Sequence, residues 1–263
     1  LRAVDTSNNE RPVVIKRPAP NDAPPIRAGQ EVSILNERKA LLRLDGHPVS
    51  TEYVDSGQFS AGGMTHQYIV MERAEGAIIE EMVLELARSG ERLPLLETCI
   101  VVDALLDLLI KAHEKDVVYN DVDAKHLFWE RDVYRLKVID WGNAVFLEGD
   151  EMTPQGISRQ TDIYQVGELL YFILSGGGRA DIPRDADESF ALDFGDDAER
   201  VPSELQTIVS KAAHPNTRHR YQSMRELRRA LSGFRQPLER DRDATVNRVL
   251  ERLRRNLSKN DLR

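Results

Sequence analysis

The sequence is poor in cysteine and aromatic residues, and it has no long hydrophobic run. Cys99 is its single cysteine, which excludes an internal disulfide or a cysteine-rich zinc site and favours a reducing compartment. The most apolar stretch, 100–110, is too short to span a bilayer and is interrupted by Asp103 and Asp107. Because the first residues show no signal-peptide pattern, we expect a cytoplasmic protein with no membrane segment in this part of the chain.

An excess of positive charge is also missing. The 36 lysines and arginines are outnumbered by 44 aspartates and glutamates, which gives a formal net charge of −8. A duplex nucleic-acid binder normally presents a basic face, so we expect no nucleic-acid partner. The chain has 263 residues, of which 41% are hydrophobic and 30% charged, and this predicts one or two globular domains rather than a disordered or fibrous protein.

The first third of the chain contains most of the predicted strands. Residues 11–16 hold three consecutive β-branched residues and predict a strand that ends in Lys16. The proline-rich stretch 17–26 predicts a stiff connector, with a peptide-ligand motif as the alternative. The hydrophobic spacing of 30–44 then predicts a helix.

A glycine-rich stretch, 57–63, lies between two further predicted strands, near 49–54 and 67–71. We tested this stretch as a phosphate-binding loop. Such a loop would end in a Gly-Lys-Ser/Thr sequence and open a helix, and this stretch does neither. It therefore predicts the loop of a β-hairpin.

The rest of the chain is predominantly helical. Apolar spacing predicts helices at 94–115, 161–175, 202–214 and 221–234, and short strands near 126–129 and 135–139. The acidic segment 176–200 predicts a solvent-exposed loop, and the charged tail from 236 predicts an extra helix or a linker. This order indicates a small β-rich lobe and a larger helical lobe, with the cleft between them as a ligand site.

Two short segments each place an aspartate beside a predicted strand. Asp121 lies in Tyr-Asn-Asp-Val-Asp-Ala-Lys-His, and Asp140 lies 19 residues later in Val-Ile-Asp-Trp-Gly. A hairpin between them would bring both carboxylates into one site. One carboxylate could then hold a metal ion while the other orients a hydroxyl nucleophile.

From residue 1 to about 235, the chain resembles the protein kinase family through six segments in the family's order. They are Val-Val-Ile-Lys at 13–16 with Glu37 after it, Tyr-Ile-Val-Met-Glu-Arg-Ala-Glu-Gly at 68–76, Asp121 at the H-R-D aspartate, Asp-Trp-Gly at 140–142, Thr-Asp-Ile-Tyr-Gln-Val-Gly at 161–167, and Arg-Tyr-Gln-Ser at 220–223. Each segment alone is a weak signal, and their common order is a strong one. The last two favour protein kinases over small-molecule phosphotransferases.

The resemblance implies an α+β fold of two lobes. It divides the chain into an N-lobe at 1–75, a C-lobe at 76–235, and a charged helical tail or linker at 236–263. The N-lobe begins at the strand that follows the Gly-rich loop in kinases, so the first strand and that loop are missing from this sequence. Because the first residue is leucine rather than methionine, we expect a fragment of a longer chain.

The resemblance also assigns nucleotide-binding roles. Lys16 would hold the α- and β-phosphates of ATP, and Glu37 would hold Lys16, with Glu31 as a competing partner. The other implied contacts surround the adenine: Val14 and Phe128 would sandwich the ring, Met71 would form the back of the pocket, and the backbone from Glu72 to Ala74 would bond the ring edge.

The remaining implied roles concern transfer of the phosphate. Asp140 would bind Mg²⁺, and Asp121 would accept or orient the substrate hydroxyl. His126 stands where the family has an asparagine that binds a second magnesium. It is either a metal ligand, which suits softer ions than Mg²⁺ and would tolerate Mn²⁺, or only a hydrogen-bonding residue. Asp123 replaces a lysine of serine/threonine kinases, and Lys125 is expected to supply the lost positive charge.

Several departures from the family concern regulation and packing. Asn120 replaces the arginine that binds a phosphorylated loop, and the segment from 140 to 162 is short, so we expect no control by loop phosphorylation. No A-P-E sequence supplies a glutamate partner for Arg220. Tyr119 and Trp141 are expected to stack with Leu41, while the paired Asp103 and Asp107 are expected to face solvent or cap neighbours.

The sequence therefore predicts an enzyme that moves the γ-phosphate of ATP to a serine or threonine hydroxyl of a protein, with Mg²⁺ as the metal. The alternative is a pseudokinase, a nucleotide-binding or scaffold module that acts on a regulatory partner. Retention of Lys16, Glu37, Asp121 and Asp140 favours the enzyme, because a chain without catalysis has no chemical need for that full set.

Overall fold

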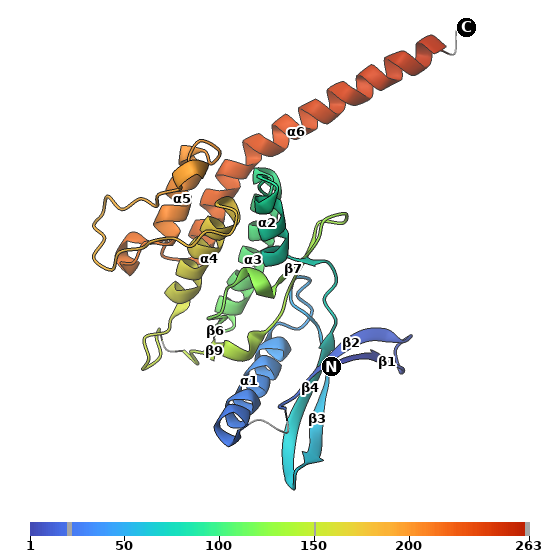
Figure 1. The fold of residues 1–263 in the computed structure, drawn as a ribbon, viewed down its shortest axis with the longest axis vertical. Helices are drawn as coiled ribbons and strands as arrows, with labels where there is room; N and C mark the ends of the chain where they lie inside the picture. The colour runs from blue at the N-terminus through green and yellow to red at the C-terminus, as the bar shows by residue number, and fades with distance from the viewer. Residues whose placement is uncertain (20–22, 150, 261–263) are drawn as a thin grey trace.

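A computed structural model describes residues 1–19, 23–149 and 151–260 (Figure 1). Its first lobe is a four-stranded antiparallel sheet in the order β1–β2–β4–β3, with one helix beside it. The bounds are Arg2–Asp5 for β1, Arg11–Lys16 for β2, Tyr53–Ala61 for β3, Met64–Glu72 for β4 and Pro24–Arg43 for α1. The predicted strand at 11–16 is confirmed as β2.

Helix α1 begins at Pro24, six residues before the predicted start. Prolines occupy its first positions, which is favourable because the first amides of a helix have no partner within it. The prediction that 17–26 forms a connector is therefore wrong for Pro24–Ile26, and Pro20 lies outside the described residues. Ile34, Glu37 and Leu41 share the buried face of α1, which packs against the sheet and the second lobe.

The hairpin of β3 and β4 is confirmed, but its turn is tighter than predicted, and the strand predicted near 49–54 is wrong for 49–52 because β3 begins at Tyr53. The strands reach Ala61 and Met64, so the loop is only Gly62–Gly63, and both glycines have positive φ, 61° and 77°. Two-residue hairpin loops require such φ values, which glycine adopts without strain. Gly57, predicted to lie in the loop, is instead a strand residue opposite Tyr68.

The second lobe is built around helix α3 (Leu95–Glu114), which confirms the helix predicted at 94–115. The helix is buried on nearly all sides, as expected of an apolar helix in a core. The elements around it are α2 (Ile79–Arg88), α4 (Arg159–Leu174), α5 (Ser203–Ala212), α6 (Met224–Asn260), and the short strands β5 (Ala77–Ile78), β6 (Val117–Val118), β7 (Leu127–Glu130), β8 (Arg135–Val138) and β9 (Val145–Phe146).

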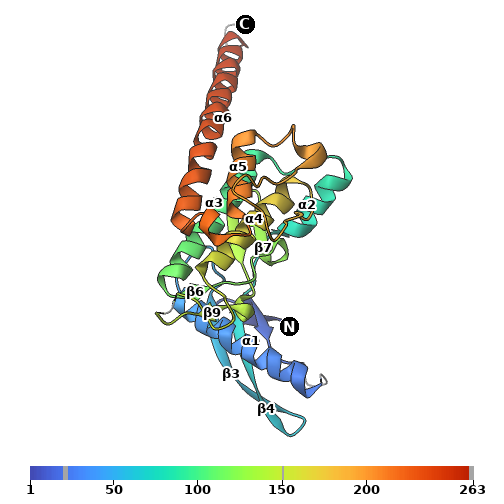
Figure 2. The ribbon, with the colours of Figure 1, turned by 90° about the vertical axis from the view of Figure 1, so that its left-hand side faces the viewer.

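Helix α6 packs on α3 and then extends away from the rest of the molecule (Figure 1 and Figure 2). The sequence predicts a helix that ends at 234, whereas the structure continues it through Pro237 as one helix. Asp103 and Asp107 are predicted to face solvent or cap neighbours. Instead, Arg228 of α6 donates hydrogen bonds to both carboxylates. Arg235 adds a second ion pair to Asp103 at 3.0 Å, so the two aspartates dock α6 on α3.

The acidic segment 176–200 is less exposed than predicted. Leu192 and Phe194 are buried in the core, and the carboxylate of Asp197 pairs with Arg92 at 2.9 Å. The segment therefore covers part of the helical lobe instead of forming a free loop. Within the described residues, no helix is long and apolar enough to cross a membrane.

Candidate functional site

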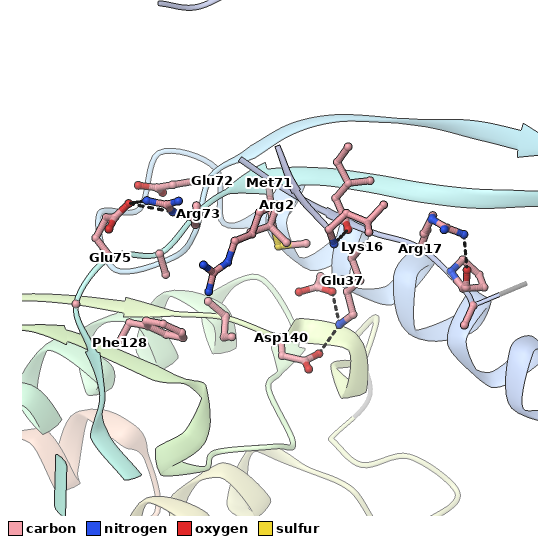
Figure 3. Close-up of a pocket in the computed structure, with 18 residues that line it drawn as sticks. Arg2, Lys16, Arg17, Glu37, Met71, Glu72, Arg73, Glu75, Phe128 and Asp140 are labelled. Carbon is pink, nitrogen blue, oxygen red and sulfur yellow. Dashed lines mark hydrogen bonds and ion pairs between the residues drawn. The ribbon is translucent and has the colours of Figure 1, made fainter. Parts of the chain in front are cut away.

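A cavity of about 770 Å³ lies between the two lobes (Figure 3). The first lobe supplies its upper wall from β2 and the end of β4, and the second lobe supplies Phe128 of β7 and Asp140. All the residues that the sequence assigned to nucleotide binding line this one cavity: Val14, Lys16, Glu37, Met71, Glu72, Ala74 and Phe128. The fold thus brings together residues that are 114 positions apart, from Val14 to Phe128.

Lys16 is the charged centre of the cavity. Its Nζ lies 2.7 Å from Glu37 Oε2 and donates a hydrogen bond of 2.7 Å to Asp140 Oδ1. The lysine comes from the end of β2, Glu37 from the inner face of α1, and Asp140 from the loop after β8. Three elements therefore converge on one ammonium group, as the dashed contacts in Figure 3 show.

The competing partner, Glu31, lies elsewhere. Its carboxylate is 2.6 Å from His66 Nδ1 on β4. Lys16 is therefore paired with Glu37 and not with Glu31. The Glu37 side chain is only 1% exposed. Glu37 Oε1 also accepts a hydrogen bond from the backbone N–H of Trp141, which ties α1 to the segment that follows Asp140.

Burial and charge act against each other in this cluster. Burial raises the pKa of Glu37, and the neighbouring Lys16 only partly offsets that rise. For Asp140, burial would raise the pKa, but the charge and hydrogen bond of Lys16 outweigh it and hold the pKa below the usual value. Asp140 is therefore ionised at neutral pH, as a metal-binding carboxylate must be.

The backbone at Asp140 is left-handed, with a φ of 61°. Aspartate tolerates this conformation better than most residues because its short side chain can bond locally, and here it accepts the N–H of Gly142 at 3.4 Å. Asn36 of α1 donates to the carbonyl of Gly142 from the other side. The turn that presents Asp140 is thus held by α1 as well as by its own bonds.

Asp121 lies on a loop that is anchored by α4. The buried carboxylate of Asp162 accepts the backbone N–H groups of Tyr119 and Asn120, at 3.0 and 2.7 Å, and lies 2.7 Å from His113 Nε2. Asp162 lies in the segment 161–167 that resembles the kinase family, but the sequence alone assigns no role to its side chain. A buried carboxylate that accepts two amides fixes the loop strongly, because its charge strengthens each bond.

Two side chains contact Asp121 directly. Asn143 Nδ2 donates to Asp121 Oδ2 at 2.9 Å, and His126 Nδ1 lies 3.1 Å from the Asp121 carbonyl. His126 Nε2 is 3.9 Å from Asp140 Oδ2, so the imidazole stands between the two aspartates. Asn143 was missed in the sequence, where its only signal is its position directly after Asp-Trp-Gly.

Lys125 pairs with the carboxylate that it was expected to offset. Its Nζ donates to Asp123 Oδ2 at 2.8 Å, and both side chains are partly exposed. Burial tends to raise the pKa of Asp123, but the bonds from Lys125 outweigh it and lower the pKa. The pair is thus charged on both sides, next to the loop that carries Asp121.

Tyr119 and Trp141 pack together behind the cavity, but their ring planes are inclined by 50° and are not stacked face to face as predicted. The rings of Tyr119 and Trp141 are 4.5 Å apart, and Leu41 is buried in the same core. The Tyr119 hydroxyl donates to the carbonyl of Ile139 at 2.6 Å. Arg220, for which no glutamate partner was expected, instead donates to the carbonyls of Gln160, His214 and Pro215.

The residues present fit a magnesium ion that is shared with a phosphate ligand. Among the described residues, no group of three or more His, Cys, Asp or Glu side chains is arranged to hold a metal alone. Mg²⁺ is commonly held by one or two carboxylates, with phosphates and water completing its shell. The ionised Asp140 meets that need, and His126 is the less suitable ligand because its nitrogen favours softer ions.

Comparisons with curated proteins point to bacterial serine/threonine kinases. The chain is 24% identical over 223 residues to serine/threonine-protein kinase PksC of Streptomyces coelicolor. The aligned region covers 73% of this chain and 39% of PksC. It is 27% identical over 165 residues to the probable serine/threonine-protein kinase YbdM of Bacillus subtilis, covering 63% of this chain and 60% of YbdM. Serine/threonine-protein kinase PknB of Mycobacterium leprae is 24% identical, over 69% of this chain and 32% of PknB.

No family model matches the chain. Among solved structures, the Cydia pomonella granulovirus kinase PK-1 superposes with a TM-score of 0.62 at 18% identity, covering 85% of this chain and 86% of that one. The fold is therefore the α+β bilobal fold of a divergent protein-kinase-like domain. The chain spans about a third of the length of the first curated relatives that it matches.

Proposed function

We propose that this divergent protein-kinase-like domain binds ATP with Mg²⁺ and transfers the γ-phosphate to a serine or threonine hydroxyl of a protein. The observation that carries the proposal is the contact of Lys16 with both Glu37 and Asp140 at 2.7 Å in the wall of the interlobe cavity. The names of the curated relatives support serine or threonine as the acceptor.

The adenine would lie between apolar side chains from the two lobes. Val14 lines the cavity from the first lobe and Phe128 from the second, so both faces of a planar ring would meet apolar side chains. The backbone N–H groups of Glu72 and Arg73 are already bonded, to the carbonyls of Glu52 and Pro12. The N–H of Ala74 makes no hydrogen bond to any residue that the structure describes, so it is available to the ring edge.

The charged end of the cavity suits the phosphates. Lys16 would contact the α- and β-phosphates, and Glu37 would keep the ammonium group in place through the buried ion pair. Asp140 would hold the magnesium ion, which neutralises the charge that develops on the phosphates during transfer. Positioning and charge neutralisation, rather than a covalent intermediate, would then provide the catalysis.

Asp121 would accept or orient the acceptor hydroxyl. Its Oδ2 is held by Asn143, and its loop is held by Asp162 on α4, so the carboxylate has a defined direction. Lys125 would neutralise Asp123, which would otherwise repel the transferring phosphate. The roles proposed for Asp121 and Lys125 do not depend on phosphorylation of the segment 140–162.

The test is transfer of labelled γ-phosphate from ATP to a protein acceptor, followed by identification of the phosphorylated amino acid. We expect phosphoserine or phosphothreonine. Asp121→Asn should lower kcat by about 10²- to 10⁴-fold, the usual contribution of a general base, and leave the affinity for ATP within about threefold. Asp45→Asn, at an exposed position after α1, is the matched control and should keep full activity.

The second candidate function is that of a pseudokinase. The substitution at His126 favours it, because the imidazole fills the space between Asp121 and Asp140 that a second metal ion would need. A protein that binds ATP with metal but transfers no phosphate to any acceptor, itself included, would support this alternative. Transfer that depends on Asp121 would exclude it.

A further inference from the structure

Lys137 of β8 links the second lobe to the first lobe beside the cavity. Its Nζ donates to the carboxylate of Glu72 at 2.7 Å and to the carbonyl of Ser50 at 3.1 Å. The Lys137 side chain is only 13% exposed, so these bonds are largely shielded from water. Neither the roles assigned from the sequence nor the proposed function uses this lysine.

Glu72 makes three further polar contacts within the first lobe. Its Oε2 accepts the backbone N–H of Glu52 at 3.1 Å and lies 4.0 Å from the guanidinium of Arg11, which pairs with Glu52 at 2.8 Å. The backbone N–H of Glu72 donates to the carbonyl of Glu52 at 2.9 Å. Lys137 and Arg11 thus flank the neighbouring carboxylates of Glu52 and Glu72. Arg11 belongs to the first lobe, as both glutamates do, whereas Lys137 comes from the second lobe.

The position of Lys137 on its hairpin relates it to the cavity. Lys137 of β8 is the register partner of Phe128 of β7, and opposed residues of an antiparallel pair have their side chains on the same face. Phe128 lines the cavity, so the same face of the hairpin carries both the cavity floor and the bond to Glu72. Figure 3 shows Phe128 below the segment that carries Glu72, Arg73 and Glu75.

Backbone bonds next to this ion pair join the same two lobes. The N–H of Val138 donates to the carbonyl of Val49 at 2.8 Å, and the N–H of Thr51 donates to the carbonyl of Val138 at 3.4 Å. These bonds hold the segment before β3 against β8. They do not reach the end of β4, where Lys137 provides the direct contact with Glu72.

We propose that Lys137 is a positioning residue that holds the connecting segment 73–76 through Glu72, and thereby sets the affinity and base selectivity of the nucleotide site. The carbonyl of Glu72 and the N–H of Ala74 would discriminate adenine from guanine only if they keep one fixed direction. Without the lysine, the carboxylates of Glu52 and Glu72 would share Arg11 alone and repel each other. The effect on nucleotides rests on the proposed function, whereas the effect on the segment does not.

The experiment compares Lys137→Met, Lys137→Arg and the matched control Arg135→Met in the full chain. Arg135 lies on the same strand, its side chain is 55% exposed, and it pairs with Glu130 of the same hairpin. Hydrogen exchange without nucleotide reports on the amides of Glu72 and Arg73, and titration with ATP and GTP gives both affinities. For Lys137→Met we expect exchange to be about tenfold faster, affinity for ATP to be about tenfold weaker, and the preference for ATP over GTP to fall.

The control should match the wild type, and Lys137→Arg should recover most of the ATP preference. Exchange at Glu72 and Arg73 that is equal in Lys137→Met and Arg135→Met would overturn the proposal. If the wild type binds neither nucleotide, the proposed function is wrong, and exchange alone then decides the role of Lys137. If Lys137→Met does not fold, Lys137→Gln, which keeps a polar side chain but removes the charge, replaces it with the same expected outcomes.

Discussion

At the scale of single residues, the site depends on one cation shared by two carboxylates. Glu37 is buried and its charge has one cationic partner among the described residues, Lys16. Asp140 shares that lysine but is also reached by water. Removal of Lys16 would therefore leave a buried carboxylate without compensation, which is costly, and would bring the two negative groups into repulsion.

The first prediction concerns the pH dependence of stability. Burial lowers the pKa of Lys16, but Glu37 and Asp140 outweigh burial and raise the pKa above 10.5. The folded state then holds the proton more tightly than the unfolded state, so this stabilisation is complete below the unfolded value and is lost as pH rises through the folded one. The free energy of unfolding of the wild type, relative to Lys16→Met, should be constant from about pH 8 to 10 and fall above about pH 10.5.

Denaturant unfolding of both proteins across this range measures the difference. The tyrosines and other lysines titrate in both proteins and cancel. A difference that stays constant from about pH 8 to 12 would show that Lys16 is not held by its two carboxylates.

The second prediction concerns Lys125 and Asp123. Loss of Lys125 leaves the negative charge of Asp123 unpaired near the loop that carries Asp121. That charge disfavours the approach of a phosphate. We expect Lys125→Ala to lower kcat by up to about tenfold, limited by solvent screening because both side chains are partly exposed. The double variant with Asp123→Ala should recover most of the activity. Steady-state kinetics of the two proteins check this, and a double variant as slow as Lys125→Ala would give the lysine a different role.

At the scale of elements, close helix packing supports the loop that holds Asp121. Gly167 of α4 faces the end of α5, where a Cβ would lie 2.5 Å from the backbone nitrogen of Ala213. Because the atoms that a Cβ at Gly167 would meet belong to the backbone, any larger residue there would force α5 to move. The contact keeps α4 in the position from which Asp162 binds the Asp121 loop.

The third prediction uses this glycine. Gly167→Ala should lower the free energy of unfolding by about 1–3 kcal/mol through overpacking. The matched control is Gly233→Ala on α6, where a Cβ would meet nothing within 4 Å. That substitution should stabilise the protein by about 0.5–1 kcal/mol, because alanine is the better helix former. Denaturant unfolding compares the two, and equal effects would contradict this account of the contact.

Most elements were predictable because their local patterns are strong. The β-branched run of β2, the apolar helix α3 and the β7–β8 hairpin match their predicted ranges closely. Helix α2 was missed, although its apolar residues recur at helical spacing. The start of α1 was misplaced because prolines, read as a connector, also suit the first turn of a helix.

The candidate site was predictable where the chemistry is local to a motif. Lys16, Glu37 and Asp140 stand out by residue type and order, and the structure places them in contact. Asp162 and Lys137 were not found this way, because no motif read from the sequence assigns a role to either side chain. Their bonds to residues 42 and 65 positions away depend on how the elements pack. A pattern in one short window contains no information on such contacts.

At the scale of the whole molecule, the two lobes are joined by contacts that do not require a modified loop. Helix α1 of the first lobe is held to the segment after Asp140 by Asn36 and Glu37. Lys39 lies 4.0 Å from the centre of the Phe146 ring and 2.8 Å from Glu148. These contacts keep Glu37 on Lys16, and they support the interpretation that phosphorylation of the loop is not needed to assemble the site.

A thermal-shift titration of the whole chain with ATP, with and without Mg²⁺, is the most direct test of the nucleotide site. Ligand that binds the native state raises Tm by mass action, by about 5–10 °C at 100 times the Kd. We predict a rise in the wild type that requires the metal, is lost in Lys16→Met and Asp140→Asn, and is kept in Lys111→Met, whose lysine is exposed on α3. A wild type whose Tm does not respond to ATP with either Mg²⁺ or Mn²⁺ would contradict the nucleotide site at the centre of this account.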